Sequence, residues 1–555
     1  MQREMLAGGT AAPGTRAERV PRARALDWVW DRYRLGVGAI TAAVGLFLAL
    51  RLTAWPPHED ETLVFFVSRR PLADVFDAVL GERGGAPLHY LLAHVALSVD
   101  ASLAALRALS AVFAVASLPV TAALVARLAG RRVALLTVLL AAASWSLLFH
   151  GIYARMYGLF LFASVLSCLL LVRGLERGTW KRWAAWAGCA LALAATQPYG
   201  ALVLAAQGIF TVALRLGGRS VPLRRPLAAA GAVLLLATPL WVTYAHLASR
   251  FGVGVGEGSR SELGSPLDVL GYLWEVLGDF SAGWAAAAIP LALLTLAGAV
   301  VLARRRPDAA IFAVAIVVVP AVALTATRSG SGLFLETRHL IFVLPFFAMA
   351  LAAGLLAAAE GSGRARPYVL ALGAAGIVAL QLAWGVSKTP WLYGGEPEER
   401  TEARSAAAAW LSSSGRPDDV LFGYEPTYLD AALEGAPFGR VFVPRADPEL
   451  ALEALRDAGE PLGRGVWVLD ASDHLDRSLV RLTIPERSPG ESFEARAFGP
   501  FLVLRTREPT GSAEAFLRAT LTVQILSEDL GIGDAGINAA AAEKALERLA
   551  DESAR

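Results

Sequence analysis

A histidine followed by three carboxylates, His58-Glu59-Asp60-Glu61, comes directly after the first long apolar run of the sequence. Asp60 and Glu61 would lie where a first transmembrane helix leaves the bilayer. A partly desolvated carboxylate there has a raised pKa, which suits a general base, and it could also bind a metal ion. The dipole at the N-terminus of a solvated helix also favours acidic residues. The pattern alone leaves both interpretations open.

Further polar clusters lie between apolar runs, around Arg155 and around Arg338. A guanidinium group offers paired donors to phosphate, so both arginines are candidates for binding a phosphate group. For each cluster alone, anchoring of Arg and Tyr at the membrane surface is the alternative. Tyr157 is a further candidate for binding the phosphate group, beside Arg155. The candidates for binding other parts of a substrate are His58, His89, Tyr90, Gln197, Tyr199 and His339.

The composition indicates a membrane protein. Of 555 residues, 55% are hydrophobic and only 18% are charged, with a mean hydropathy of +0.50. Globular proteins have about 25% charged residues. Cys168 and Cys189 both lie inside apolar runs, which argues against a disulfide framework or a thiolate metal site. No glycine-rich phosphate loop occurs, so we predict neither an ATP-driven pump nor a nucleotide-sugar enzyme. The net charge of +2 indicates no nucleic-acid partner.

About eleven runs are long and apolar enough to be transmembrane helices, since roughly 20 helical residues cross the hydrocarbon. They cover about 35–53, 105–126, 133–151, 157–173, 183–197, 199–216, 226–245, 284–303, 308–327, 339–359 and 367–386.

Basic residues occur in every second loop between these runs and in the segment 1–34 before the first. Basic loops face the cytoplasm. We therefore predict a multi-pass protein of the cytoplasmic membrane whose segment 1–34 is cytoplasmic, with no cleaved signal peptide. The alternate loops, including 54–104, then face outward.

The outward segments are the longer ones. In the first outer loop, 54–104, the stretch 71–80 has helical apolar spacing and is predicted to lie along the interface. Pro87–Val99 is apolar but too short to span. Loop 246–283 is a candidate lid. Residues 388–510 are expected to form a small α/β domain outside the membrane, with strands near 420–424, 440–443 and 465–469 and a helix at 401–412. Residues 511–555 are expected to form a helical tail.

The topology brings Asp60, Arg155, Gln197 and Arg338 to the same side of the membrane, where they suit an anionic lipid-linked substrate. The order of these clusters resembles the GT-C membrane glycosyltransferases, in particular the protein O-mannosyltransferase and aminoarabinose transferase branch (glycosyltransferase family 39 type). The resemblance covers about 35–390. It is carried by Asp60-Glu61, by Ala86-Pro87-Leu88-His89-Tyr90-Leu91-Leu92, by Arg107 within 103–110, by Tyr153-Ala154-Arg155-Met156-Tyr157-Gly158-Leu159, by Thr196-Gln197-Pro198-Tyr199-Gly200, and by Arg338-His339-Leu340 with Pro345.

The resemblance implies a mainly α, polytopic GT-C domain at 35–387. It also implies an inverting transferase that moves a sugar from a polyprenyl-phosphate carrier to a hydroxyl of a protein, lipid or glycan at the outer membrane face. Asp60 would be the general base with Glu61 beside it, and Arg155 and Arg338 would hold the phosphate. No nucleotide is required. The resemblance leaves open whether a divalent metal takes part.

The sequence departs from the family pattern at two positions. Tyr153 stands where the family has an acid, and Gln197 stands in place of a histidine. A non-catalytic subunit that keeps the fold is therefore one alternative. The other is a transporter or flippase of polyprenyl-linked sugars, although transporters place charged residues near the bilayer midplane rather than at one interface.

Overall fold

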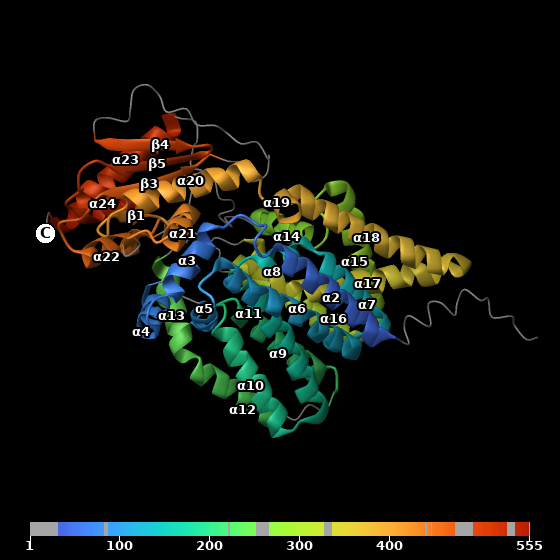
Figure 1. Cartoon of the computed structure of the whole chain (residues 1–555). Coiled ribbons are helices and arrows are strands. Elements are labelled where there is room, and N and C mark those ends of the chain that lie inside the picture. The colour runs from blue at the N-terminus through green and yellow to red at the C-terminus, as the bar shows by residue number, and fades with distance from the viewer. Residues whose placement is uncertain are drawn as a thin grey trace, which may run out of the picture.

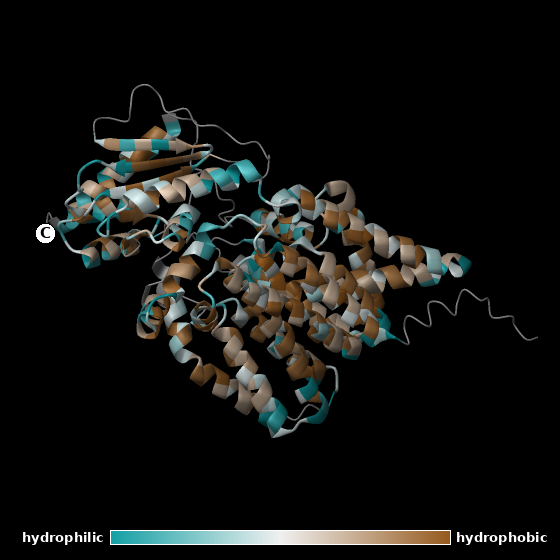
Figure 2. Ribbon diagram, in the orientation of Figure 1, coloured by the Kyte–Doolittle hydropathy of each residue, from teal (hydrophilic) through white to brown (hydrophobic). Residues whose placement is uncertain are grey.

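The structure of this protein is a computed structural model that describes residues 32–82, 87–219, 223–250, 266–326, 336–438, 441–445, 447–471, 492–529 and 539–553. The chain is mostly helical. Figure 1 shows a large helical bundle with a smaller unit of strands and helices beside it, at the end of the bundle opposite the first residues of α2. Hydropathy separates the two parts, since hydrophobic residues dominate the bundle and polar residues are frequent in the smaller unit (Figure 2).

The bundle consists of long apolar helices and short connecting ones. They are α2 (Tyr33–Arg51), α6 (Leu103–Leu128), α7 (Arg131–Ala143), α8 (Trp145–Ile152), α9 (Tyr157–Arg177), α10 (Trp180–Ala194), α11 (Gly200–Leu216), α12 (Arg224–Leu236), α13 (Thr238–Arg250), α14 (Pro266–Phe280), α15 (Ala285–Arg305), α16 (Pro307–Ala326), η2 (Thr337–Val343), α17 (Leu344–Gly361), η3 (Gly363–Ala365) and α18 (Arg366–Lys388).

Each predicted apolar run coincides with a helix or with a bent pair of helices. Within the described ranges, six helices are long and apolar enough to cross a membrane, and up to eight if each bent pair counts as one span. The pairs α7–α8 and α12–α13 bend by 59° and 53°. Pro239 in the first turn of α13 has no N–H to continue the bonding of α12. The total of about eleven spans therefore stays a prediction.

Two glycines bring α15 and α17 into close contact. A Cβ atom on Gly298 would lie 1.8 Å from the carbonyl oxygen of Ala350, and one on Gly354 would lie 2.1 Å from that of Leu294. No larger residue fits at either position, and small residues of this kind allow apolar helices to pack backbone to backbone in lipid. This contact fixes α17 at the centre of the bundle, just beyond the η2 segment that carries Arg338.

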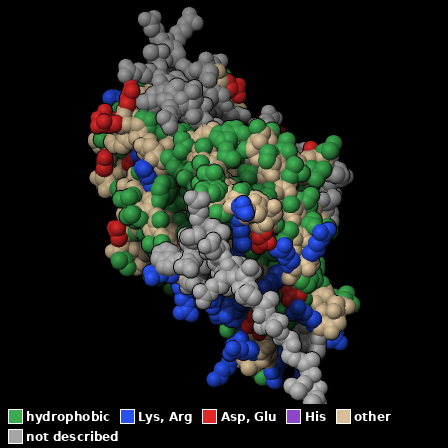
Figure 3. All heavy atoms as spheres, turned by 90° about the vertical axis from the view of Figure 1, so that its right-hand side faces the viewer, with side chains coloured by type: hydrophobic (Ala, Val, Ile, Leu, Met, Phe, Trp, Pro, Cys, Tyr) green, Lys and Arg blue, Asp and Glu red, His purple; other side chains and the backbone are tan. Residues whose placement is uncertain are grey.

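The basic loops meet at one end of the bundle. Arg127 at the end of α6 lies 3.9 Å from Glu176 near the end of α9, and Arg225 at the start of α12 donates to the carbonyl of Gly178. Two further pairs at these ends are Arg219 with Asp308 at 2.6 Å and Arg305 with Glu360 at 2.7 Å. In Figure 3, Lys and Arg side chains gather in the lower half of the face shown, below a largely hydrophobic region.

Short helices between α2 and α6 form the predicted first outer loop. They are α3 (Glu59–Ser68), α4 (Leu72–Asp77), the π-helical turn η1 (Ala78–Glu82) and α5 (Pro87–Val99). The helix predicted at 71–80 is thus observed as α4 and η1. At 13 residues α5 is apolar and short, as predicted. Of the predicted lid 246–283, residues 251–265 lie outside the described residues, and 266–280 form α14.

The smaller unit is a five-stranded sheet in the order β2-β1-β3-β5-β4. Strands β1, β2 and β3 are parallel, and β5 is antiparallel to both of its neighbours, β3 and β4. All three predicted strands and the predicted helix are present, whereas β4 and β5 were not predicted. The elements are α19 (Pro390–Gly394), α20 (Glu398–Ser414), β1 (Val420–Phe422), α21 (Pro426–Leu433), β2 (Val441–Val443), α22 (Pro448–Ala458), β3 (Gly465–Asp470), β4 (Phe493–Phe498), β5 (Phe501–Thr506), α23 (Ala513–Asp529) and α24 (Ala540–Ser553).

Both faces of this sheet are covered. Alternate strand residues point to opposite faces, so Trp467 and Leu469 join a core with α22, α23 and α24, while Val466 and Val468 join one with α20 and α21. Within the predicted tail 511–555 the structure describes two helices, α23 and α24, and both pack into the first of these cores. Leu63 and Phe66 of α3 pack against the second. The helix that carries Asp60 therefore lies between the bundle and the sheet.

Candidate active site

The first turn of α3 is closed by a reciprocal cap. The Nδ1 atom of His58 accepts the Asp60 backbone N–H at 3.1 Å, and the Glu61 carboxylate accepts the His58 backbone N–H at 3.1 Å. This capping box satisfies two N–H groups that a helix start otherwise leaves unpaired. Successive residues of a helix are about 100° apart, so Glu59, Asp60 and Glu61 point in three directions. Each meets a different part of the molecule.

Glu61 is fully buried and paired with Arg107 of α6. Arg107 donates from Nε to one carboxylate oxygen at 2.9 Å and from Nη2 to the other at 2.6 Å. The Ala154 N–H donates to the same carboxylate at 2.8 Å, and Arg107 also donates to the carbonyls of Leu52, Trp55 and Pro56. Every Glu61 oxygen is thus occupied. Its contacts tie α3 to the end of α2, to α6 and to the segment that carries Arg155.

Asp60 faces two arginines and a tyrosine. The Tyr153 hydroxyl donates to its Oδ2 atom at 2.6 Å, Arg338 Nη1 lies 3.4 Å from that oxygen and Arg155 Nε lies 3.9 Å from it. Burial alone would raise the pKa of Asp60, but the charges of Arg155 and Arg338 and the Tyr153 hydrogen bond hold it well below its usual range. Asp60 is therefore an ionised carboxylate in its present surroundings.

The two arginines keep donors without partners. Arg338 lies over the rings of Tyr153 and Tyr157, 5.8 Å and 5.3 Å from their centroids. Nε and Nη1 of Arg155 and Nε of Arg338 are buried and lack a hydrogen-bond partner among the described residues. Buried polar groups are nearly always paired. These donors are therefore suited to an anionic group that joins them between the arginines.

Tyr153 takes up the position of the missing second acid. Its hydroxyl binds Asp60 and lies 3.1 Å from His58 Nδ1. Burial and the charge of Asp60 raise the pKa of Tyr153 well above its usual value, so the phenol stays a neutral donor. A phenol and two guanidinium groups around one carboxylate do not make a divalent metal site. Within the described ranges, no three His, Cys, Asp or Glu residues gather in a way that could hold a metal ion.

A second ionic cluster, formed by α14 and the end of α18, contacts the residues that precede Arg338. Asp279 at the end of α14 accepts a hydrogen bond from Thr337 Oγ1 at 2.6 Å and forms an ion pair with Lys388. Tyr272 of α14 donates to the Glu336 carbonyl at 3.0 Å, and Glu336 forms an ion pair with Arg338. The two residues that precede Arg338 are thus both held by α14. Asp279, Tyr272 and Lys388 were not predicted, although Asp279 and Lys388 are charges that flank apolar runs.

The other predicted residues lie at varying depths around this centre. The His339 ring stacks on Tyr199 with centroids 4.7 Å apart, and its Nδ1 accepts the Glu336 N–H. His89 and Tyr90 are buried. Burial and the charge of Arg155 lower the pKa of His89 to about 3. Gln197 is buried in the turn before α11, and no recorded contact in the described part of the chain joins its side chain to Asp60.

His150 of α8 is a further buried residue that the sequence did not single out. Its ring lies 5.1 Å from that of Tyr157 and 6.2 Å from that of Tyr153. Neither ring nitrogen has a hydrogen-bond partner among the residues that the structure describes. It lies three residues before Tyr153, almost one helical turn away, and only this spacing could have indicated it.

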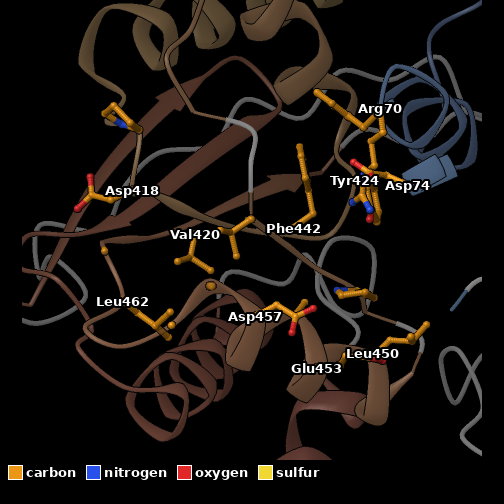
Figure 4. A pocket seen from close by; sticks show the side chains of 18 of the residues that line it. Arg70, Asp74, Asp418, Val420, Tyr424, Phe442, Leu450, Glu453, Asp457 and Leu462 are labelled. Carbon is orange, nitrogen blue, oxygen red and sulfur yellow. The ribbon is translucent and has the colours of Figure 1, made fainter. Parts of the chain in front are cut away.

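A groove of about 720 Å³ opens between the end of α3 and the smaller unit (Figure 4). Its floor includes Phe66, Tyr424 and Phe442, whose rings are in contact, with centroids 4.4 Å apart for Phe66 and Phe442 and 4.9 Å for Tyr424 and Phe442. Arg70 and four carboxylates also line it: Asp74, Asp418, Glu453 and Asp457. Figure 4 shows Arg70 and Asp74 at one end and Asp418 toward the other.

Comparisons with known proteins identify the architecture. No protein-family model matches the sequence. No curated protein gives a significant match. Among solved structures, ArnT from Cupriavidus metallidurans bound to undecaprenyl phosphate superposes with a TM-score of 0.54 at 16% identity, over 87% of this chain and 98% of that one. The apo state of ArnT gives a TM-score of 0.55 at 15% identity with the same coverage.

A second similar structure is the arabinofuranosyltransferase AftD from Mycobacteria. It matches with a TM-score of 0.50 at 18% identity, over 85% of this chain and 40% of that one. Identities this low show a common fold and no more. The fold expected from the order of the sequence motifs is therefore confirmed: the chain has the GT-C fold of membrane glycosyltransferases.

Proposed function

We propose that the protein is a glycosyltransferase that moves a sugar from a polyprenyl-phosphate carrier to an acceptor hydroxyl. The observation that carries this proposal is the ionised Asp60 between Arg155 and Arg338, three of whose buried donors lack a hydrogen-bond partner in the described part of the chain. A carboxylate beside an anion site fits a base next to a departing phosphate. The similarity to ArnT, which has been seen with undecaprenyl phosphate, supports a lipid-linked donor.

The reaction is a single displacement at the anomeric carbon. Asp60 takes the proton of the acceptor hydroxyl as its oxygen bonds to the anomeric carbon. The bond from that carbon to the phosphate oxygen breaks, and its electron pair leaves with the phosphate. Arg155 and Arg338 stabilise the negative charge that develops there, an effect that is strong where water is excluded. The configuration of the sugar inverts, and no nucleotide is consumed.

The same arginines explain how a carboxylate with a depressed pKa can act as a base. In the present arrangement their charges hold Asp60 ionised but weakly basic. A phosphate bound to their unpartnered donors competes for this positive charge. The Asp60 pKa then rises toward its ordinary value, so the base becomes effective only when a donor is present. Tyr153 stays a neutral hydrogen-bond donor that orients Asp60.

Glu61 has a positioning role in this proposal. The sequence paired it with Asp60 as a catalytic residue, but its carboxylate is enclosed by Arg107 and two backbone N–H groups. It cannot accept a proton from an acceptor without breaking these contacts. Tyr157 supports Arg338 through its ring. His58, His89, Tyr90, Gln197, Tyr199 and His339 remain candidates for contact with the sugar or the carrier.

We also propose that the site and the smaller unit face outward from the cytoplasmic membrane, with the segment 1–34 inside. The basic loops meet at the opposite end of the bundle from Asp60, as the positive-inside rule requires. The smaller unit then meets the acceptor outside, and the groove beside α3 is its proposed approach to Asp60.

Purified protein in liposomes is expected to consume undecaprenyl-phosphate-linked sugar and release undecaprenyl phosphate, one molecule for each sugar found on an acceptor from solubilised envelope lipids and proteins. A transporter or flippase would move the carrier intact across the bilayer. A non-catalytic subunit would do neither. Mass spectrometry of the lipid products separates the three outcomes, and carrier movement without cleavage would contradict the proposal.

Replacing Arg338 with Gln is expected to move the acid limb of kcat/KM to higher pH. Asp60 has a depressed pKa, so it stays ionised as the pH falls through the usual carboxylate range near 4. Loss of the Arg338 charge raises that pKa, and protonation then occurs at higher pH. The limb is measured in liposomes for both proteins. The control is Arg306→Gln, which alters an exposed arginine at the opposite helix ends and should leave the acid limb of the kcat/KM profile at its original pH. If Arg338→Gln also left the acid limb at its original pH, Asp60 would be excluded as the titrating base.

A further inference from the structure

Glu59, the first of the three acids, faces the smaller unit. Its Oε1 atom accepts from Arg445 Nε at 3.0 Å and from the Tyr424 backbone N–H at 3.2 Å, and Oε2 lies 2.9 Å from Arg445 Nη2. This two-point pairing of a guanidinium and a carboxylate fixes direction as well as distance. It joins residues more than 360 positions apart in the sequence. The neighbouring residue in α3 is Asp60.

The partners of Glu59 come from adjacent parallel strands. Tyr424 and Glu425 follow β1, and Arg445 follows β2, so all three lie at the carboxyl edge of the sheet. Arg445 also forms an ion pair with Glu425. Burial raises the pKa of Glu425, while the charge of Arg445 opposes this rise. Arg445 therefore links Glu59 of α3 to Glu425 of the sheet edge.

The Glu59–Arg445 contact is surrounded by apolar packing between α3 and the smaller unit. Phe66 of α3 packs on Phe442 of β2, and Leu429 of α21 joins the core around Val64 and Phe65. On its other side α3 is fixed by Glu61 and Arg107. Asp60 therefore sits on a helical turn held from both sides, by the bundle through Glu61 and by the smaller unit through Glu59.

We propose that Arg445 is a positioning residue for the reaction, and that the smaller unit completes the catalytic centre by setting the orientation of Asp60 through Glu59. The inference rests on the proposed function of Asp60. A turn released on one side can rotate, and a misplacement of about 1 Å lowers a rate by roughly 100-fold. Binding of the carrier phosphate, which depends on Arg155 and Arg338, does not require this hold.

The test compares Arg445→Gln with a matched variant, Arg464→Gln. Arg464 forms a two-point ion pair with Asp419, both bonds being 2.9 Å, buried in the same unit and not joined to α3. Thermal stability, undecaprenyl phosphate affinity, kcat and KM are measured for both in liposomes. We expect both variants to be less stable. At a temperature where both are folded, only Arg445→Gln loses about 100-fold in kcat, with phosphate affinity unchanged.

A double-mutant cycle with Glu59→Gln separates positioning from general destabilisation. The two changes together are expected to lower kcat no further than either alone, because they remove one interaction. Equal loss of kcat in Arg445→Gln and Arg464→Gln, or additive losses in the cycle, would overturn the inference. If the unaltered protein and Arg464→Gln both fail to transfer sugar, the proposed function itself fails, which is a different result.

Discussion

Asp60→Asn is expected to lower sugar transfer by about 10²–10⁴-fold, the usual contribution of a general base. The amide is nearly isosteric with the carboxylate, so the Tyr153 hydroxyl can still donate to the side-chain oxygen, and the helix start retains its His58 cap. The amide cannot take up the acceptor proton. The measurement is the rate of undecaprenyl phosphate release by purified protein in liposomes, together with its thermal stability and its affinity for undecaprenyl phosphate.

Asp77→Asn is the matched control. Asp77 is an exposed carboxylate at the end of α4 in the same connection between α2 and α6, and its replacement should leave the rate unchanged. Phosphate affinity of Asp60→Asn should equal or exceed that of the unaltered protein, because a negative charge between the arginines has been removed. Near-normal transfer by folded Asp60→Asn protein would refute the base assignment.

Glu61→Gln is expected to have the largest effect on stability, roughly 3–5 kcal/mol. The change leaves the Arg107 guanidinium buried without a counter-charge, since both side chains are almost inaccessible to solvent. The loss would appear as a lower SDS concentration at half-unfolding in mixed micelles. Transfer should fall as well, because Glu61 holds the turn that carries Asp60.

The control for this change is Glu176→Gln. Glu176 lies 3.9 Å from Arg127 at the basic ends of the helices, and both side chains are more than a third exposed. Exposed pairs contribute only about 0–1 kcal/mol. If the two variants unfolded at the same SDS concentration, the buried pair would not be what stabilises the contact of α3 with α6.

The apolar runs, the basic loops and the three parallel strands could all be predicted from sequence, because each depends on a local pattern of hydropathy or charge. β4 and β5 were not predicted. The β4 sequence 493–498 contains glutamate and arginine among its apolar residues, which weakens its strand pattern. The two strands pair with each other across the short turn at Gly499-Pro500, so this hairpin is a local feature, and only the pairing of β5 with β3 joins segments distant in the sequence.

The site could be predicted in part. Asp60, Arg155 and Arg338 were singled out by residue type and by their expected side of the membrane, and the structure brings them within 4 Å. The different contacts of the three acids were not predicted, because each acid pairs with an arginine from another element. Glu59 pairs with Arg445, Asp60 with Arg338 and Glu61 with Arg107. These partners are distant in the sequence, so no local pattern identifies them. Tyr153 was read as the loss of an acid, whereas the structure gives it a hydrogen bond to Asp60.

Under the proposed function, the shared helix α3 also sets a minimum length for an acceptor that binds in the groove. Phe66, in the floor of the groove, lies six residues after Asp60 on the same helix, which is about 9 Å at 1.5 Å per residue. An acceptor that occupies the groove and offers its hydroxyl to Asp60 has to bridge that span, about three residues of extended peptide. A small alcohol can reach one end or the other but not both. If the proposed approach through the groove is right, the length of this helical segment favours polymeric acceptors over small ones.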